Sequence, residues 1–169
     1  EEQPDEAPIV LAGFGRVGHR IGEILTRAGK PFVALDSDVA IVEKERAKGH
    51  RVFYGDARVP EIFKSACARN AEAIIVTLND TEATEELVVS LRRMYPNINI
   101  YARGHSLEDC LKLRRLGATG VVSENLEASM ELASKALISS GFKSKELQPI
   151  LVNFRKSYNA KIEHEASKE

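Results

Sequence analysis

The chain alternates between short runs of consecutive apolar residues and longer segments with a helical repeat. Six such runs occur: IVLA from Ile9, FVALD from Phe32, RVFYGD from Arg51, AIIVTL from Ala73, NIYAR from Asn99 and GVVSE from Gly120. Runs that are apolar at successive positions are typical of strands buried on both faces of a parallel sheet, and helices must cover those faces. The pattern predicts an α/β protein with a Rossmann-like, doubly wound, six-stranded parallel sheet.

The segments between the runs repeat their apolar residues every three to four positions, as amphipathic helices do. Gly29 follows the first of these segments and is a candidate for its C-cap, because glycine readily adopts the left-handed conformation found there. Asp38 is expected to cap the second helix, and Asn79 or Asp80 the helix after the fourth strand.

The pattern changes after Glu124, where no further strand follows. NLEASMELASKALISSGF predicts one long helix, and apolar positions from Leu147 to Ile162 predict a second, before a charged tail that holds His164. We therefore expect a linker at residues 1–7, a Rossmann-like domain at 8–123, a crossover helix at 124–142 and a C-terminal helical segment at 143–169. These helices must be covered, either by the sheet or by a second copy of the chain.

Composition narrows the range of partners. Charged residues make up 29% of the 169 residues and the formal net charge is −1, so the basic surplus that nucleic-acid binding requires is absent. The two cysteines, Cys67 and Cys110, lack metal-site spacing, and we expect them to be reduced, as in the cytosol. No apolar run is long enough to span a membrane, and the leading EEQPDEAP is typical of a linker cut from a longer protein.

The segment IVLAGFGRVGHRIGEIL places Gly13, Gly15 and Gly18 at the G-x-G-x-x-G spacing between a strand and a helix. In a dinucleotide-binding fold, the first glycine permits the tight turn, the second lets a phosphate approach backbone N–H groups, and the third lets the helix pack closely. Asp36, at the end of the second strand, has the position of the acid that accepts hydrogen bonds from the ribose hydroxyls. Its negative charge disfavours the 2′-phosphate of NADP.

Further candidates lie near these glycines and at the carboxyl ends of other strands. The guanidinium of Arg16 can bind a nucleotide phosphate in a forked arrangement. Asp56 and Ala57 follow the third strand, and Thr77 and Leu78 end the fourth, beside the crevice where open α/β sheets bind ligands. Each of these residues also has an ordinary interpretation, as a solvated arginine, a simple turn or a strand end.

The residues for hydride-transfer chemistry are not apparent. The sequence contains no Y-x-x-x-K pair and no H-x-x-x-H, and among its four histidines only His105 follows a strand end. The segment after the sheet is also too short for a substrate domain. These features favour a nucleotide-binding regulator over an enzyme, with a small NAD-dependent oxidoreductase or its subunit as the alternative.

As a set, GFGRVG, FVALDSD, GHRVFYGDAR, AIIVTLND, YARGHSLEDCLKLRRLGATGVVSEN and NFRKSYN resemble the cytoplasmic RCK, or KTN, regulatory domain of bacterial Kef-type potassium efflux systems. The resemblance extends over nearly the whole chain after the linker. A related Trk-type regulator of potassium uptake is a further alternative. The absence of a small second lobe before the FRKSYN helix favours the Kef type.

The resemblance implies a homodimeric, ligand-gated regulator of a potassium/proton antiporter at the cytoplasmic face of the bacterial inner membrane. Its implied partners are the transmembrane antiporter domain of the same full-length protein and a flavoprotein ancillary subunit. AMP, or alternatively NAD(H), would occupy the Rossmann site. Glutathione would keep transport closed and its bulky adducts would open it, with the 124–142 helix serving dimerisation and 143–169 ligand sensing.

The implied nucleotide contacts fall on the glycine-rich loop and two strand ends: Gly13, Phe14, Gly15, Arg16, Asp36, Asp56 and Ala57. The neighbouring residues Val17, Gly18, Ser37, Thr77 and Leu78 complete the predicted nucleotide set. The implied glutathione contacts fall on Arg103 and Asn159, with Arg155 of FRKSYN as a further candidate. A strand-end arginine suits a carboxylate of glutathione, and an asparagine offers both a donor and an acceptor to a peptide.

Overall fold

The computed structural model describes residues 7–65 and 70–168, so Cys67 and most of the expected linker lie outside the described residues. The strands are β1 (Ile9–Ala12), β2 (Phe32–Asp36), β3 (Val52–Tyr54), β4 (Ala73–Val76), β5 (Asn99–Gly104) and β6 (Gly120–Ser123). The helices are α1 (Arg16–Arg27), α2 (Val39–Ala47), α3 (Ile62–Ser65), α4 (Thr81–Met94), α5 (Leu107–Leu116), α6 (Glu124–Ser139) and α7 (Ser144–Ala166). Six strands in the order β3-β2-β1-β4-β5-β6 confirm the predicted fold class.

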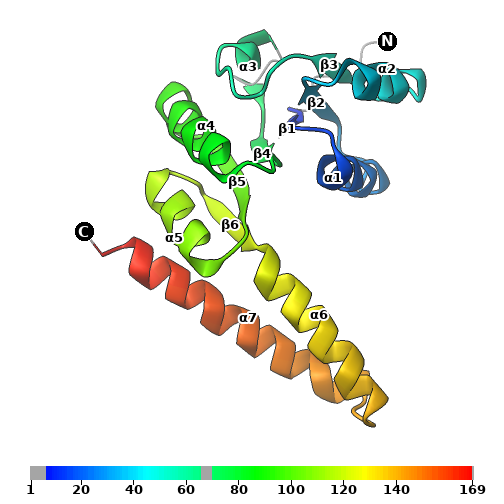
Figure 1. Ribbon diagram of the computed structural model, residues 1–169, viewed down its shortest axis with the longest axis vertical. Helices are drawn as coiled ribbons and strands as arrows, with labels where there is room; N and C mark the ends of the chain where they lie inside the picture. Colours follow the sequence, from blue (N-terminus) through cyan, green and yellow to red (C-terminus); the bar gives the residue numbers. More distant parts are fainter. Residues whose placement is uncertain (1–6, 66–69, 169) are drawn as a thin grey trace. The chain divides into compact units, whose positions relative to one another are not determined.

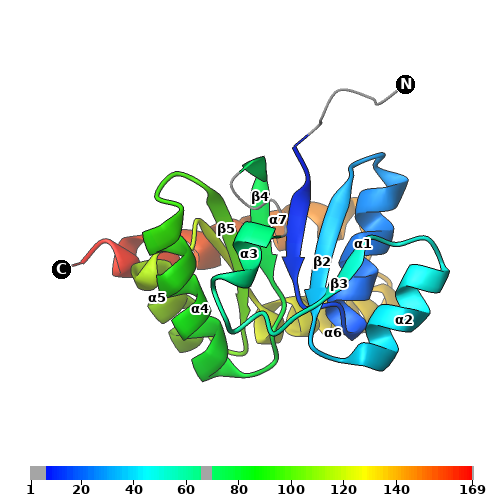
Figure 2. The same ribbon diagram turned by 90° about the horizontal axis from the view of Figure 1, so that it is seen from above.

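The strands from β1 to β5 are parallel and pair in register around the central strand β1. Val10 lies between Val33 of β2 and Ile74 of β4, and Ala12 lies between Leu35 and Val76. Figure 2 shows β1 and β2 running in one direction, with the turn into α1 at their carboxyl ends. This edge is where a Rossmann-like sheet presents its ligand site.

The chain forms two compact units, Glu1–Ala102 with Leu116–Gly120, and Arg103–Arg115 with Val121–Glu169. The division follows the spatial packing, and it cuts through β5 and β6. The boundaries expected at 7, 123 and 142 stay predictions.

In the first unit, helices α1 and α2 cover one face of the sheet and α4 the other (Figure 1). Leu11, Phe32, Ala34 and Val52 form a buried apolar cluster with Val42 of α2, and Ile21 and Leu25 of α1 pack against it. Alternate strand residues such as Val10 and Ile74 are fully buried as well. Burial of both faces explains why the strand runs are apolar at consecutive positions.

The predicted N-caps of two helices are confirmed in this unit. Asp38 caps α2 by accepting hydrogen bonds from the N–H groups of Ala40 and Ile41. Asp80, rather than Asn79, caps α4. The C-cap residue of α1 is Ala28 rather than Gly29, which follows it with a φ of 72°, in the left-handed region. These signals are local, which is why the sequence shows them.

Arg92 of α4 forms several hydrogen bonds at one end of the first unit. Its guanidinium donates to the carbonyl oxygens of Gly117 at 2.9 Å and Ile98 at 2.8 Å, and to the hydroxyl of Thr119 at 3.1 Å. The hydroxyl of Thr119 in turn accepts from the N–H of Ile100 in β5. One arginine therefore holds the two connections that lead into β5 and β6.

The second unit contains α5 and the two C-terminal helices. The long helix α6 is capped by Ser123, and a turn that includes Gly141, whose φ is 101°, separates it from α7. Leu126 and Met130 of α6 and Leu147 and Ile162 of α7 are buried. No helix in residues 7–65 and 70–168 combines the length and the apolar character needed to cross a membrane.

The expectation of a frayed tail around His164 was wrong, because α7 continues to Ala166. Arg114 of α5 binds the carboxylate of Glu163 at 2.8 Å, and Arg115 donates to the carbonyl of Glu165 at 3.0 Å. These contacts, together with the buried Ile162, stabilise a helix end whose charged sequence suggested fraying.

The second unit also contains Cys110 of α5, and burial raises the pKa of its thiol to about 11.

Candidate nucleotide-binding site

The three glycines of the motif lie in the β1–α1 loop and the first turn of α1, and the structure requires two of them. Gly13 has a φ of 111°, and a Cβ there would lie 2.7 Å from the Thr77 hydroxyl. A Cβ on Gly18 would lie 2.2 Å from the carbonyl oxygen of Gly13, because the helix returns so close to the loop. These two glycines are required by the fold itself.

Gly15 differs from both. Its φ of −74° is open to any residue, and a Cβ there would meet no atom of the chain within 4 Å. Neither the backbone conformation nor packing requires a glycine at this position. A group that must come close to the loop from outside the chain does explain it.

The N-terminus of α1 follows Gly15 directly and has no side-chain cap. By contrast, α2, α4 and α6 are capped by Asp38, Asp80 and Ser123. The first turn of α1 also holds no acidic residue. The N–H groups and the positive end of the helix dipole are therefore available to an anion such as a phosphate.

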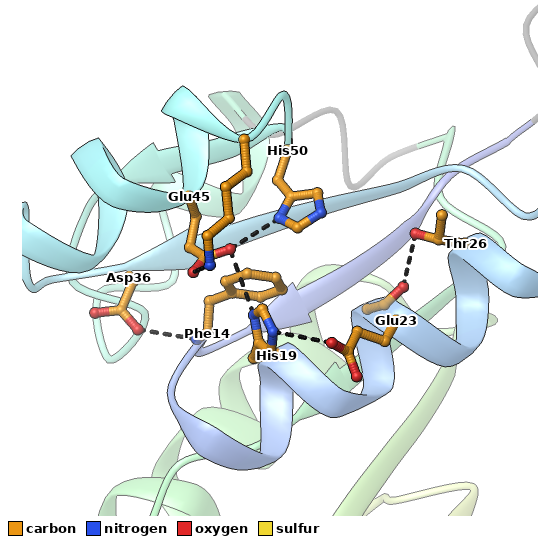
Figure 3. Close-up of polar contacts among 9 residues, drawn as sticks. Phe14, His19, Glu23, Thr26, Asp36, Glu45 and His50 are labelled. Carbon is orange, nitrogen blue, oxygen red and sulfur yellow. Dashed lines mark hydrogen bonds and ion pairs between the residues drawn. The ribbon is translucent and has the colours of Figure 1, made fainter.

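Asp36 lies at the end of β2, next to this loop (Figure 3). One carboxylate oxygen accepts from the N–H of Phe14 at 2.9 Å, and the other accepts from the N–H of Asp38 at 2.8 Å. The carboxylate thus braces the glycine-rich loop. Each oxygen keeps a lone pair that a ribose hydroxyl can use.

The residues around the loop differ in their exposure to solvent. Arg16 is exposed at the first position of α1, Val17 is half-buried and Ser37 is exposed after β2. Phe14 is 2% exposed and belongs to the core cluster, and its N–H donates to the Asp36 carboxylate. Arg16 is the side chain of this group best placed for a phosphate.

Thr77 and Leu78 follow β4 on the other side of the loop. The hydroxyl of Thr77 donates toward the carbonyl oxygens of Ala12 at 3.1 Å and Gly13 at 3.0 Å, and the residue is buried. Thr77 therefore supports the loop from behind, whereas Leu78 is half-buried beside Gly13.

The turn after β3 holds Asp56 and the buried Ala57. Arg58 donates to both carboxylate oxygens of Asp56, at 2.8 and 3.0 Å, and this hydrogen bonding holds the pKa of Asp56 below its ordinary value. The N–H of Gly55 donates to the carbonyl of Asp36, which ties this turn to β2. A nucleotide at this turn would therefore face an Asp56–Arg58 ion pair, and the sequence motif did not single out Arg58.

A buried carboxylate, Glu45 of α2, lies beside the loop and was not anticipated (Figure 3). It accepts from Lys48 at 3.0 Å and pairs with Nδ1 of His50 at 2.9 Å, and Nδ1 of His19 is 3.4 Å away. Burial alone would raise the pKa of Glu45, but the contacts with Lys48, His50 and His19 outweigh it, and the pKa is lowered. In the described ranges, no group of three or more His, Cys, Asp or Glu side chains is arranged to hold a metal ion.

The predicted glutathione residues lie in the second unit. Arg103 is the last residue but one of β5 and binds Glu124 at the start of α6, whose other carboxylate oxygen pairs with His105 at 2.8 Å. Arg155 of α7 forms two hydrogen bonds with Glu127 of α6, at 2.9 and 3.2 Å. Asn159 is exposed one helical turn beyond Arg155. Both arginines are thus engaged by acids of α6.

Comparison with known proteins extends these observations. The TrkA-N domain family matches residues 9–124. The TrkA-N domain of the inner membrane protein ybaL from Escherichia coli is 30% identical, with a TM-score of 0.71 over 75% of this chain and 94% of that one. The Kef CTD of Shewanella denitrificans in its AMP-bound form is 25% identical, with a TM-score of 0.81 over 95% of this chain and 98% of that one.

The GsuK channel bound to NAD is also similar, at 31% identity and a TM-score of 0.66. The match covers 83% of this chain but 26% of the channel chain. The family match takes in β1 through β6, and therefore the whole glycine-rich loop and Asp36. This chain belongs to the TrkA-N domain family.

Proposed function

We propose that this chain is the nucleotide-binding regulatory domain of a potassium transport system, and more narrowly of a Kef-type potassium/proton antiporter. The observation that carries the proposal is Gly15, a loop glycine that neither backbone conformation nor packing requires, beside the uncapped start of α1. Membership of the TrkA-N family supports it, as do similar proteins with bound AMP and NAD.

In the proposed complex, an adenine nucleotide places its phosphate at the N-terminus of α1 and its ribose at Asp36. The glycine-rich loop with Arg16 and Val17 would contact the phosphate, and Ser37, Asp56, Ala57, Thr77 and Leu78 would border the nucleoside. AMP is the proposed nucleotide, because the similar Kef CTD, whose alignment covers 95% of this chain, has AMP bound. NAD(H) is the alternative. No catalytic step is proposed.

Calorimetry with AMP and NADH, combined with an assay of NADH oxidation, tests the nucleotide proposal. We expect AMP to bind at one site per chain and NADH to remain unoxidised, because the loop offers phosphate contacts and the function needs binding alone. Turnover of NADH with a small carbonyl substrate would instead support the oxidoreductase alternative. Absence of binding by both nucleotides would contradict the proposal.

Regulation follows from linkage between ligand binding and transport. A ligand shifts a gate only through its different affinities for the open and closed states, with a typical coupling of about 1 to 3 kcal/mol. The proposed ligands are glutathione, which closes transport, and its bulky adducts, which open it.

The proposed partners are the transmembrane antiporter domain and a flavoprotein ancillary subunit, at the cytoplasmic face of the bacterial inner membrane.

The proposed homodimer would use the C-terminal helices. Ile150 and Phe154 of α7 are 50% and 52% exposed, one turn apart, and Tyr158 continues the same stripe. On α6, Leu132 and Ile138 are 68% and 51% exposed. An exposed apolar stripe of this kind is typical of a protein interface, and a second copy of the chain is its proposed partner.

Glutathione binding is proposed at Arg103, with Asn159 and Arg155 as further contacts. Because Glu124 already holds Arg103, a carboxylate of glutathione would have to share or replace that ion pair. We expect Arg103→Ala to weaken glutathione binding at least tenfold while AMP binding is unchanged, as measured by calorimetry. Glu124→Gln is the companion variant and should strengthen glutathione binding, because it removes the competing charge. Unchanged glutathione affinity in Arg103→Ala would remove this residue from the proposed site.

A further inference from the structure

A pocket of about 370 Å³ lies between helices α1 and α2, beside the glycine-rich loop. One wall is formed by Arg16, His19 and Arg20 of α1, and the other by Lys44 and its neighbours on α2. On each helix the lining positions are three and four residues apart, so they share one face. Phe14 and Ile41 add an apolar surface to the pocket.

The pocket carries an excess of positive charge. Its one acid, Glu45, is 5% exposed, and Lys48, His50 and His19 surround its carboxylate. Within the described part of the chain, no acid pairs with Arg16, Arg20 or Lys44, all of which are exposed. Arg16 and Arg20 are one turn apart, where like charges repel. An anion bound among the three would relieve this repulsion.

From these observations, we propose that the α1–α2 pocket is a second anion site, which binds a small ligand with phosphate-type charges beside the nucleotide and shares Arg16 with it. Two arginines offer the forked donors that match phosphate oxygens, and Lys44 adds a point charge from the facing helix. The pocket, at about 370 Å³, has room for a pyrophosphate ion. The pocket adjoins the nucleotide loop through Gly15 and Arg16, both of which line it, whereas Arg20 and Lys44 are not among the proposed nucleotide contacts.

Calorimetric titration of the chain with inorganic pyrophosphate tests this site, with and without saturating AMP. We expect pyrophosphate to bind in both conditions. The double variant Arg20→Gln/Lys44→Gln should bind it at least tenfold more weakly and keep its affinity for AMP. The matched control Arg27→Gln/Arg93→Gln removes the same charge from exposed positions of α1 and α4 outside the pocket, and should bind pyrophosphate as the parent does.

Each other outcome overturns the proposal. Complete loss of pyrophosphate binding in the presence of AMP would mean that both ligands occupy one phosphate position at the start of α1. An equal loss in the control variant would indicate an effect of net charge alone. A polyglutamate peptide that binds where pyrophosphate does not would assign the pocket to an acidic protein segment. AMP binding in the parent remains the separate measure of the proposed nucleotide function.

Discussion

Substitution of Gly18 by alanine is expected to destabilise the fold by about 3 kcal/mol, as overpacking of a tight contact does. The added Cβ would lie 2.2 Å from the carbonyl oxygen of Gly13, a backbone atom that cannot rotate away. Either α1 or the β1–α1 loop must move, and the loop is held from behind by Thr77 and Asp36. Urea denaturation of the variant measures the change in the free energy of unfolding.

Gly22→Ala is the matched control, since Gly22 is a buried glycine of the same helix. A Cβ on Gly22 would meet the ring edges of Phe32 at 2.9 Å and Phe14 at 3.0 Å, which are side-chain atoms that can shift. We expect a smaller loss for Gly22→Ala than for Gly18→Ala. Equal stability of Gly18→Ala and the parent would show that the helix does not approach the loop this closely.

The fold was predictable because its signals are local. A strand buried on both faces must be apolar at successive positions, and Phe32–Leu35 and Ile74–Val76 show this directly. Helix caps depend on one side chain and the next few N–H groups, so Asp38 and Asp80 could be recognised without knowledge of the fold. The tail beyond Ile162 was misjudged, since its helix depends on Arg114 and Arg115, about fifty positions earlier in the chain.

The candidate site was predictable only in part, because some of its features depend on contacts that the spacing of residues in the sequence does not show. The spacing of Gly13, Gly15 and Gly18 marks the loop, but it does not distinguish the glycine that packing leaves free from the two that packing requires. The close contacts of the folded chain account for that difference. Contacts between segments distant in the sequence also produce the hydrogen bond from the N–H of Phe14 to Asp36 and the burial of Glu45 against two histidines, and no sequence motif indicates either.

Gly15→Ser is expected to abolish most of the proposed nucleotide binding without loss of stability. A serine at this N-cap position can accept a hydrogen bond from the first turn of α1, which now has no side-chain cap, so the fold should be as stable or slightly more stable. The same side chain would occupy the space through which a phosphate approaches the N–H groups. We expect at least a tenfold loss of AMP affinity, equivalent to about 1.4 kcal/mol, measured by calorimetry beside urea denaturation.

The two measurements on Gly15→Ser separate a functional glycine from a structural one. Stability retained with AMP binding lost would assign Gly15 to the ligand, in contrast to Gly18, whose substitution should reduce stability whether or not a ligand is present. Since Asp36 and Arg16 stay in place in the variant, the loss could not come from the ribose contact or from removal of the arginine. Unchanged AMP affinity would contradict the placement of the phosphate at the start of α1, and with it the observation on which the proposed function rests.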